Sequence, residues 1–390
     1  MASFTSSLTP AQKLLCAAIA DQPMEARVAA AGQLVAMLGE ENAFALAEAN
    51  EVAPQLAHAV LENLGARAAP YWAAVHEGNA RKLQAFLDEL DIVAGQLAQA
   101  GIPLIALKNG GIARGIYPCV GCCPMGDLDV LVRPDDFQQA HGILEQGNYQ
   151  LCYRSELEQD NFEHARRSGS AEYHKTLADG TELWFELLWR PVDGRWIRPD
   201  QEPGAAELVR RSVAIPGTSV RLLAPADNLL QVCLHTAKHT YVRAPGFRLH
   251  TDVDRIVRRQ NVDWETFLKR VRALQVKTAV YFSLAIPVQL FRTPVPPTVL
   301  CALRPPAWKE KLLTRWLVRV GLFNPGEKKF SKPGYILFNA LLYDDFHGLL
   351  RSIFPARGWM KARYYFQSDW LLPVYHLRRL FDLAFHRVNT

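Results

Sequence analysis

One short run constrains the fold of this chain more than any other: Met125-Gly126-Asp127-Leu128-Asp129-Val130-Leu131-Val132. Successive side chains of a β-strand point to opposite faces, so Asp127 and Asp129 share one face while Leu128 and Val130 share the other. The chain must therefore form a sheet that buries one face of this strand and accommodates two carboxylates on the other. Carboxylates this close repel each other, and a divalent cation relieves the repulsion. The run predicts a Mg²⁺ site; a solvated strand end is the alternative, because Asp-x-Asp also occurs by chance.

A glycine pair precedes this strand in the sequence. Residues 102–107 predict a short buried strand, followed by Lys108-Asn109-Gly110-Gly111 and a helical stretch, 112–117, that stops at Pro118. Glycines between a strand and a helix let backbone N–H groups approach an anion, and Lys108 adds a positive charge for phosphate. A plain strand-to-helix turn explains Gly110 and Gly111 equally well. Neither the Walker nor the dinucleotide-binding spacing is present.

A third carboxylate follows downstream. Residues 174–178 and 181–189 predict two strands joined by a two-residue turn at Asp179-Gly180. Alternation places Glu182 and Glu186 on one face of the second strand, and either could complete a three-carboxylate metal site. Exposed strand glutamates are the alternative, which we favour for Glu182.

A polar stripe is predicted on the helix over residues 225–241. Gln231, His235, Lys238 and His239 recur at helical spacing along one side. Histidines four residues apart can bind a metal, but the glutamate of a zinc-protease motif is absent. The stripe either faces a cleft and contacts phosphate or acceptor, or forms a polar surface.

The order of glycine turn, short helix, Asp-x-Asp strand and later carboxylate strand resembles the DNA polymerase β-like nucleotidyltransferase superfamily. More narrowly, the chain is similar to the uncharacterised bacterial nucleotidyltransferases. The matching segments are residues 107–111, 116–118, 126–134, 173–174, 185–190 and 235–239, then Asp252, 263–264, 354–364 and 375–380.

The resemblance implies an α+β fold, with a small mixed-sheet polymerase β-like core flanked by N-terminal and C-terminal helical regions. It implies an enzyme that uses Mg²⁺ or Mn²⁺ and an NTP donor, in which an acceptor attacks the α-phosphorus. By position, Asp127 and Asp129 would hold the metals and Glu186 the ion nearest the nucleophile. The remaining implied contacts are Lys108, Gly110 and Gly111 with the triphosphate, and a cleft role for His174, His235, Lys238 and His239, with Asp252 as an anchor for a basic side chain.

Three positions depart from the family pattern. The family has Lys-Gly where this chain has Lys108-Asn109, a histidine where it has Leu188, and a basic residue where it has Cys123. Loss of that charge argues against full triphosphate binding, whereas the retained carboxylates favour activity. Two alternatives stay open: a non-catalytic nucleotide-binding or scaffold module of a biosynthetic complex, and a toxin-like enzyme that nucleotidylates tRNA or protein.

Composition sets wider limits on partners. The net charge of +5 among 390 residues is mild, and no stripe of basic residues interleaved with aromatics is present, so a nucleic-acid partner is not expected. By analogy with the family, the expected acceptor is a sugar, a peptide or a phosphorylated small molecule. The N-terminus lacks an export signal, and the most apolar stretch, 279–291, is too short to span a bilayer, so we expect a cytoplasmic protein.

The cysteines are expected to be reduced. Cys119, Cys122 and Cys123 form a cluster just before the Asp-x-Asp strand. Zinc would need a second pair of ligands at suitable spacing, and none is obvious in the sequence. Free thiols are therefore expected, with a redox switch as a further hypothesis.

The chain divides into four expected regions. Residues 1–100 form a helical N-terminal region, 101–200 the nucleotidyltransferase core, 201–293 a helical domain and 294–390 a basic helical C-terminal region. Within the core, residues 135–147 predict a helix. The aromatic, basic tail 370–388 predicts an amphipathic helix, which can lie on an anionic membrane but more often packs on its own domain.

Overall fold

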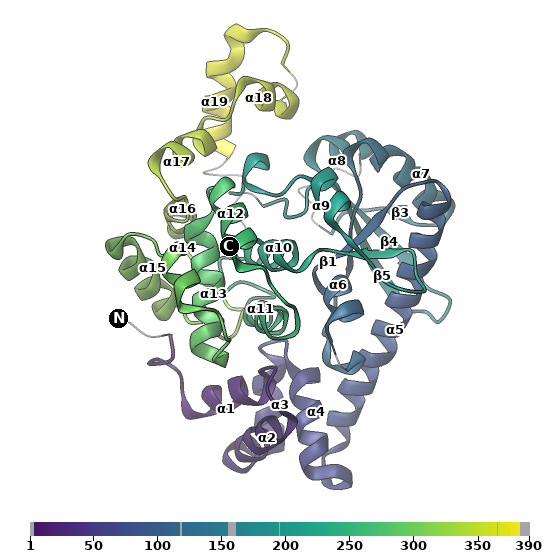
Figure 1. The fold of residues 1–390 in the computed structure, drawn as a ribbon, viewed down its shortest axis with the longest axis vertical. Helices are drawn as coiled ribbons and strands as arrows, with labels where there is room; N and C mark the ends of the chain where they lie inside the picture. The colour runs from purple at the N-terminus through teal and green to yellow at the C-terminus, as the bar shows by residue number, and fades with distance from the viewer. Residues whose placement is uncertain (1–3, 118, 155–160, 195, 365, 383–390) are drawn as a thin grey trace.

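The computed structural model describes residues 4–117, 119–154, 161–194, 196–364 and 366–382. Within these residues a mixed seven-stranded sheet, in the order β3-β4-β5-β2-β1-β7-β6, lies among many helices, which is consistent with the predicted α+β class (Figure 1). The strands are β1 (Leu104–Leu107), β2 (Leu128–Leu131), β3 (Gln150–Leu151), β4 (Ser170–Thr176), β5 (Glu182–Leu188), β6 (Val213–Ala214) and β7 (Val220–Leu222).

The centre of the sheet mixes parallel and antiparallel pairs. Strand β2 is antiparallel to β1 and parallel to β5, whereas β4 and β5 form an antiparallel hairpin. This register places Asp129 opposite Glu186, and Glu186 opposite Glu172 on its other side. Three carboxylates therefore come from adjacent positions of three neighbouring strands.

Two helices cover the apolar face of the sheet. Leu128 and Val130 of β2 and Phe185 of β5 are fully buried in one cluster with α5 (Pro70–Gln99) and α7 (Phe137–Gln146). The alternation of apolar side chains explains this packing, because Leu128, Val130 and Phe185 point away from the carboxylates. The polar ends of Asp129 and Glu186 are thus held on the opposite face.

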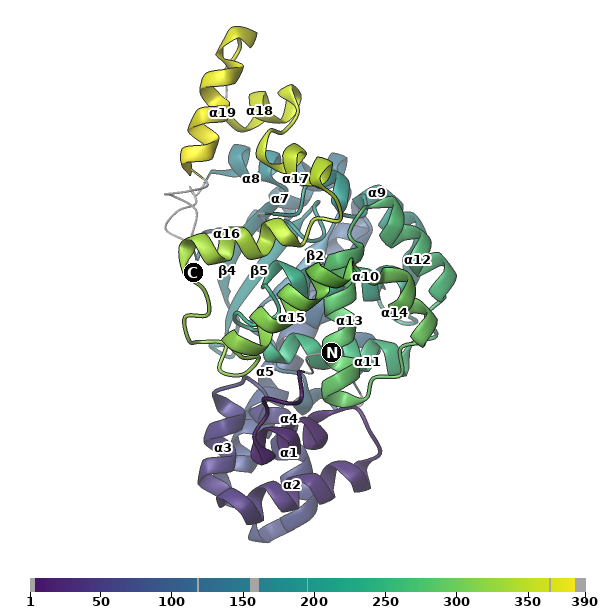
Figure 2. The same cartoon turned by 90° about the vertical axis from the view of Figure 1, so that its left-hand side faces the viewer.

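The other helices lie on several sides of the sheet (Figures 1 and 2). The N-terminal helices lie at one end of the molecule, and Arg259 of α11 binds Asp21 at 2.6 Å to connect them to the later helices. The helices are α1 (Pro10–Ile19), α2 (Met24–Leu38), α3 (Glu40–Glu48), α4 (Ala53–Leu64), α6 (Lys108–Gly115), α8 (Phe162–Ser168), α9 (Ala205–Arg211), α10 (Pro225–Lys238), α11 (Phe247–Arg259), α12 (Trp264–Ala273), α13 (Lys277–Phe291), α14 (Pro297–Leu303), α15 (Ala307–Val320), α16 (Lys332–Leu341), α17 (Phe346–Ile353), α18 (Arg357–Tyr364) and α19 (Leu372–Phe381).

Two local predictions need correction. Helix α6 begins at Lys108, so Gly110 and Gly111 lie inside its first turns and not in a turn before it. The hairpin loop has three residues, because Leu177 pairs with Thr181 and Gly180 takes a positive φ of 83°. A three-residue loop with a left-handed glycine is the usual alternative to a two-residue turn.

The sheet is also larger than the sequence suggests. Strand β7 pairs in parallel with β1, and β6 pairs with β7, although both come from the part of the chain expected to be helical. These strands have only two or three residues, so they show no alternation that sequence analysis could detect.

The C-terminal helices extend beyond the rest of the molecule in both views (Figures 1 and 2). The predicted tail helix is α19, which contacts α18 and leaves Val374 and Leu377 exposed, as is Trp370 in the turn before it. Residues 383–390 lie outside the described residues. Within the described part of the chain, each helix is either too short or too polar to cross a bilayer. Peripheral membrane contact stays a prediction.

Candidate active site

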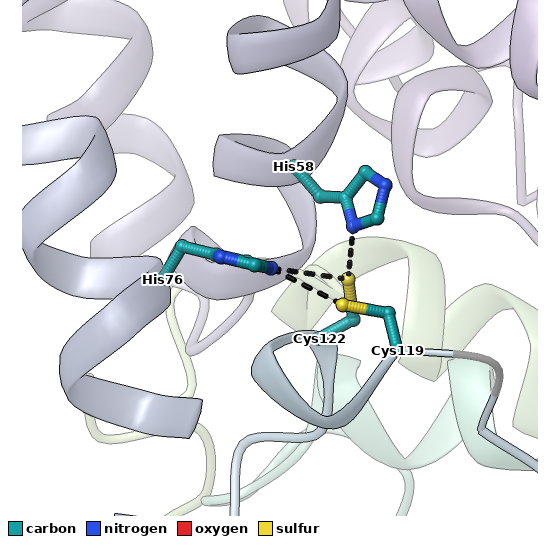
Figure 3. A group of neighbouring side chains, drawn as sticks. All are labelled: His58, His76, Cys119 and Cys122. Atoms are coloured by element: carbon teal, nitrogen blue, oxygen red, sulfur yellow. Dashed lines mark hydrogen bonds between the residues drawn. The ribbon is translucent and has the colours of Figure 1, made fainter. Parts of the chain in front are cut away.

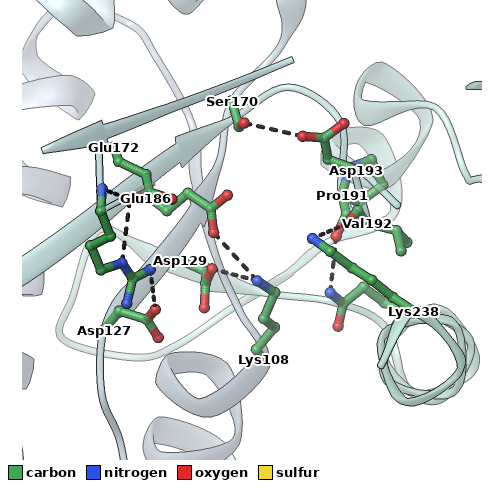
Figure 4. Close-up of polar contacts among 12 residues, drawn as sticks. Lys108, Asp127, Asp129, Ser170, Glu172, Glu186, Pro191, Val192, Asp193 and Lys238 are labelled. Carbon is green, nitrogen blue, oxygen red and sulfur yellow. Dashed lines mark hydrogen bonds and ion pairs between the residues drawn. The ribbon is translucent and has the colours of Figure 1, made fainter. Parts of the chain in front are cut away.

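The structure brings together the three carboxylates singled out in the sequence. Asp129 is 1% exposed, and the side chain of its strand neighbour Glu186 is 12% exposed. Adjacent strands lie about 4.8 Å apart, so these two carboxylates lie within reach of a single ion. Asp127 immediately precedes β2, and its side chain lies at the same end of the strand (Figure 4).

Lys108 offsets part of the negative charge of Asp129 and Glu186. Its ammonium group lies 2.5 Å from Oδ1 of Asp129 and 3.4 Å from Oε2 of Glu186 (Figure 4). Lys108 follows β1 directly and adopts a φ of 47°, a left-handed conformation that costs a residue with a side chain roughly 1 kcal/mol. This turn aims the lysine at the carboxylates and shows that a cation fits between them.

The electrostatic balance of the site depends on this lysine. Burial alone would lower the pKa of Lys108, but Asp129, Glu186 and Asp127 together raise it. Burial raises the pKa of Asp129, and the neighbouring carboxylates raise it further. Burial also acts to raise the pKa of Glu186, but Lys108 and the contact with Asp129 outweigh it and hold this pKa low.

The structure adds two residues to the site that the sequence did not predict, Arg154 and Glu172. Arg154 lies 2.7 Å from Asp127 Oδ2 and 3.3 Å from Glu172 Oε2, and its guanidinium lies over the ring of Trp184 at 5.3 Å. Glu172 could have been found, because it shares a face of the hairpin with Glu186. Nothing in the sequence pattern marks Arg154, which reaches the site from the chain beyond β3.

The two glycines permit close packing of α6 on the sheet. A Cβ at Gly111 would lie 2.6 Å from the carbonyl oxygen of Ala106, and one at Gly110 would lie 3.4 Å from Leu128. The first backbone N–H groups of a helix have no partner within the helix, so the first turn of α6 offers donors to an anion. Gly111 therefore serves the close packing of α6 on the sheet.

The predicted stripe of α10 approaches the site from the other side. Lys238 donates to the carbonyl of Val192 at 2.9 Å and Gln231 to that of Pro191 at 3.0 Å, which fixes the chain just after β5 (Figure 4). His235 and His239 lie with their rings 4.8 Å apart. Burial lowers the pKa of both histidines, and the charges of Lys108 and Lys238 lower it further, so both rings are neutral at pH 7.

Two other predicted residues lie apart from the carboxylates. His174 contacts the ring of Trp184, and its Nε2 lies beside the carboxylate of Glu182 near the end of the hairpin. Glu182 is exposed there, as favoured from the sequence. Asp252, on α11, accepts from the hydroxyl of Tyr117 at 3.4 Å and lies close to Arg248 and Arg255.

The sequence match identifies the class of protein. A sequence model of the family described as uncharacterised nucleotidyltransferase matches residues 38–292. The chain belongs to this family. The match includes the site carboxylates, Lys108 and α10, and membership confirms the family predicted from the motifs.

This nucleotidyltransferase family supports transfer of a nucleotidyl group as the general kind of reaction, with an NTP as substrate. No curated protein and no solved structure matches the chain significantly.

Proposed function

We propose that the protein is a metal-dependent enzyme that transfers a nucleoside monophosphate from an NTP to an acceptor, on a polymerase β-like core. The observation that carries the proposal is the strand register that sets Asp129 beside Glu186. The ammonium nitrogen of Lys108 lies near both, 2.5 Å from Asp129 Oδ1 and 3.4 Å from Glu186 Oε2. Buried carboxylates need such compensation, and oxygen ligands of this type suit Mg²⁺ or Mn²⁺.

Asp127, Asp129 and Glu186 would hold the metal. When bound, Mg²⁺ or Mn²⁺ polarises the phosphate oxygens and lowers the pKa of the attacking group. The acceptor oxygen then bonds to the α-phosphorus, the bond to the bridging α–β oxygen breaks, and pyrophosphate leaves, while the acceptor proton passes to a site carboxylate.

The basic side chains of the site would bind and orient the triphosphate. Lys108 and Arg154 each contact a site carboxylate in the present arrangement, and each can contribute charge to an incoming polyphosphate. The first turn of α6 adds backbone donors. Neutral His235 and His239 on α10 would contact the acceptor or a phosphate by hydrogen bonds, without adding charge.

The proposed acceptor is a sugar, a peptide or a phosphorylated small molecule. A net charge of +5 is too small to favour a nucleic-acid polymer as the acceptor. We also propose that the reaction takes place in the cytoplasm.

One observation favours a non-catalytic nucleotide-binding or scaffold role as the second candidate. The Lys108 ammonium group lies between Asp129 and Glu186, where a metal would bind, and Arg154 contacts Asp127, so two internal positive charges already offset part of the negative charge of the site. In addition, the basic residue typical of the family is replaced by Cys123, which is buried. A scaffold would bind NTP without releasing pyrophosphate.

Thermal shift and pyrophosphate release together test these candidates. We expect one NTP to raise Tm only with Mg²⁺ or Mn²⁺, and Asp127→Asn/Asp129→Asn to lose that shift. Glu182→Gln, an exposed change on the strand that carries Glu186, is the control and should keep it. A metal-dependent shift without pyrophosphate release across sugar, peptide and phosphorylated acceptors would favour the scaffold; no shift with any NTP would reject both candidates.

A further inference from the structure

Four side chains outside the candidate active site converge in the arrangement of a metal centre. His58 of α4, His76 of α5, and Cys119 and Cys122 of the loop before β2 place their ligand atoms within 4.8 Å of one another. Figure 3 shows both imidazole rings directed at the two sulfur atoms. The sequence shows the two cysteines but conceals the histidines, which lie more than forty residues upstream of Cys119 on separate helices.

The distances fit tetrahedral zinc. Nδ1 of His58 lies 3.0 Å from the sulfur of Cys122, and Nε2 of His76 lies 3.2 Å from that of Cys119 and 3.9 Å from that of Cys122. Zinc bonds of about 2.3 Å to sulfur and 2.0 Å to nitrogen set tetrahedral ligands roughly 3.5 Å apart. The observed separations bracket this value, so small side-chain movements would close the site around one ion.

The chemistry of the four ligands also favours zinc. Two thiolates and two neutral imidazoles make a site whose net charge with Zn²⁺ is zero, which suits a half-buried position between helices. Two residues separate Cys119 from Cys122, a Cys-x-x-Cys spacing found in structural zinc sites. Mg²⁺ and Mn²⁺ prefer oxygen ligands, so this centre is chemically distinct from the carboxylate site.

The surrounding loop is built for a close approach of α5. A Cβ at Gly121, between the two cysteines, would lie 2.5 Å from the ring of His76, so a larger residue there would displace this ring from its present position. Asn79, one turn further along α5, donates to the carbonyl oxygens of Gly121 at 2.9 Å and Cys123 at 3.0 Å. These bonds fix the loop in the orientation that turns both sulfur atoms toward the histidines.

We propose that His58, His76, Cys119 and Cys122 bind a structural zinc ion that ties the N-terminal helices to the loop leading into the carboxylate strand. The loop continues from Cys122 to Asp127 in five residues, and Arg248 holds the carbonyl of Pro124 on the way at 3.0 Å. Zinc would therefore restrain the loop that leads into β2. This role requires no nucleotidyl transfer and does not depend on the proposed function.

The test is the metal content of the full-length protein, purified under reducing conditions without chelator. We expect about one zinc per chain, and less than a tenth of that in Cys119→Ser/Cys122→Ser. Cys123→Ala, next to the cluster, and Asp127→Asn/Asp129→Asn should both keep the zinc. Replacement of zinc by Co²⁺ should give the thiolate charge-transfer and tetrahedral absorption bands, which reports the ligands without relying on a variant that folds poorly.

Several results would overturn the proposal. Zinc content below a tenth per chain together with no cobalt–thiolate band would reject a metal centre. Retention of zinc by the folded double cysteine variant would place the ion elsewhere. A Cys119–Cys122 disulfide in metal-free protein, mapped by mass spectrometry under non-reducing conditions, would replace the zinc site with a redox pair.

Discussion

At the scale of single residues, charge compensation governs the site. Asp129 and Glu186 are buried, and each depends on Lys108 for a nearby positive charge. Asp127 depends in the same way on Arg154. A buried charge that loses its partner destabilises a protein by several kcal/mol, so these lysine and arginine contacts make the site sensitive to substitution.

Lys108→Met should make stability depend on metal. Without the ammonium group, Asp129 and Glu186 repel each other, and we expect the free energy of unfolding to fall by about 3 kcal/mol in chelator. Mg²⁺ or Mn²⁺ should restore much of this loss, because the ion replaces the missing charge. Denaturant unfolding with and without metal measures the effect, with Lys13→Met, an exposed change on α1, as the control. Equal losses with and without metal would show that no ion binds there.

The carboxylates could be predicted from the sequence because alternation in a strand fixes which side chains share a face. Asp127, Asp129 and Glu186 follow from that rule and the family resemblance. Arg154, by contrast, contacts Asp127 although it lies 27 residues later in the sequence, and no local pattern predicts such a contact. The metal-ligand role of His58 and His76 could not be predicted for the same reason, because only the packing of α4 on α5 brings the two residues together.

At the scale of elements, the packing of α6 on the sheet positions Lys108. Helix α6 contacts both β1 and β2, and Gly111 lies against the backbone of Ala106. The sequence indicates that Gly110 and Gly111 lie where a strand meets a helix, but not that they lie inside the helix. The chain changes direction earlier, at Lys108, which has a positive φ. A positive φ at a lysine has no sequence signature.

Gly111→Ala should therefore destabilise the protein. The added Cβ would lie 2.6 Å from a backbone oxygen that cannot move away cheaply, and we expect a loss of about 1–3 kcal/mol. Gly142→Ala in α7 is the matched control, because nothing lies within 4 Å of its Cβ and alanine favours a helix by roughly 1 kcal/mol. Thermal unfolding compares the two. A neutral or stabilising Gly111→Ala would contradict the close packing of α6.

At the scale of the whole molecule, buried neutral histidines connect stability to pH. His250 of α11 is fully buried, with Nε2 2.9 Å from the carbonyl oxygen of Tyr241, and burial lowers its pKa to about 4. The unfolded chain binds a proton near pH 6.5, so between pH 6.5 and 4 it holds more protons than the folded chain. The contribution of His250 to the free energy of unfolding is fully present above pH 6.5 and is lost as the pH falls toward 4.

The loss attributable to His250 should reach about 3 kcal/mol at pH 4, since one unit of pKa corresponds to about 1.4 kcal/mol. His250→Gln keeps a neutral hydrogen-bond donor and removes the titration. We expect its free energy of unfolding, from urea unfolding at several pH values, to fall less steeply below pH 6.5 than that of the parent. Parallel curves for the two proteins would rule out His250 as a source of acid instability.

The proposed function requires that Asp129 and Glu186 bind a divalent ion together with an NTP. Electron paramagnetic resonance of Mn²⁺ tests it directly, because free Mn²⁺ gives a signal that disappears on binding. With a non-hydrolysable NTP present, we predict that the parent removes about one or two equivalents of Mn²⁺ from solution and that Asp129→Asn/Glu186→Gln removes far less. Equal binding of Mn²⁺ by the parent and by the correctly folded variant, or no binding by either, would contradict the account.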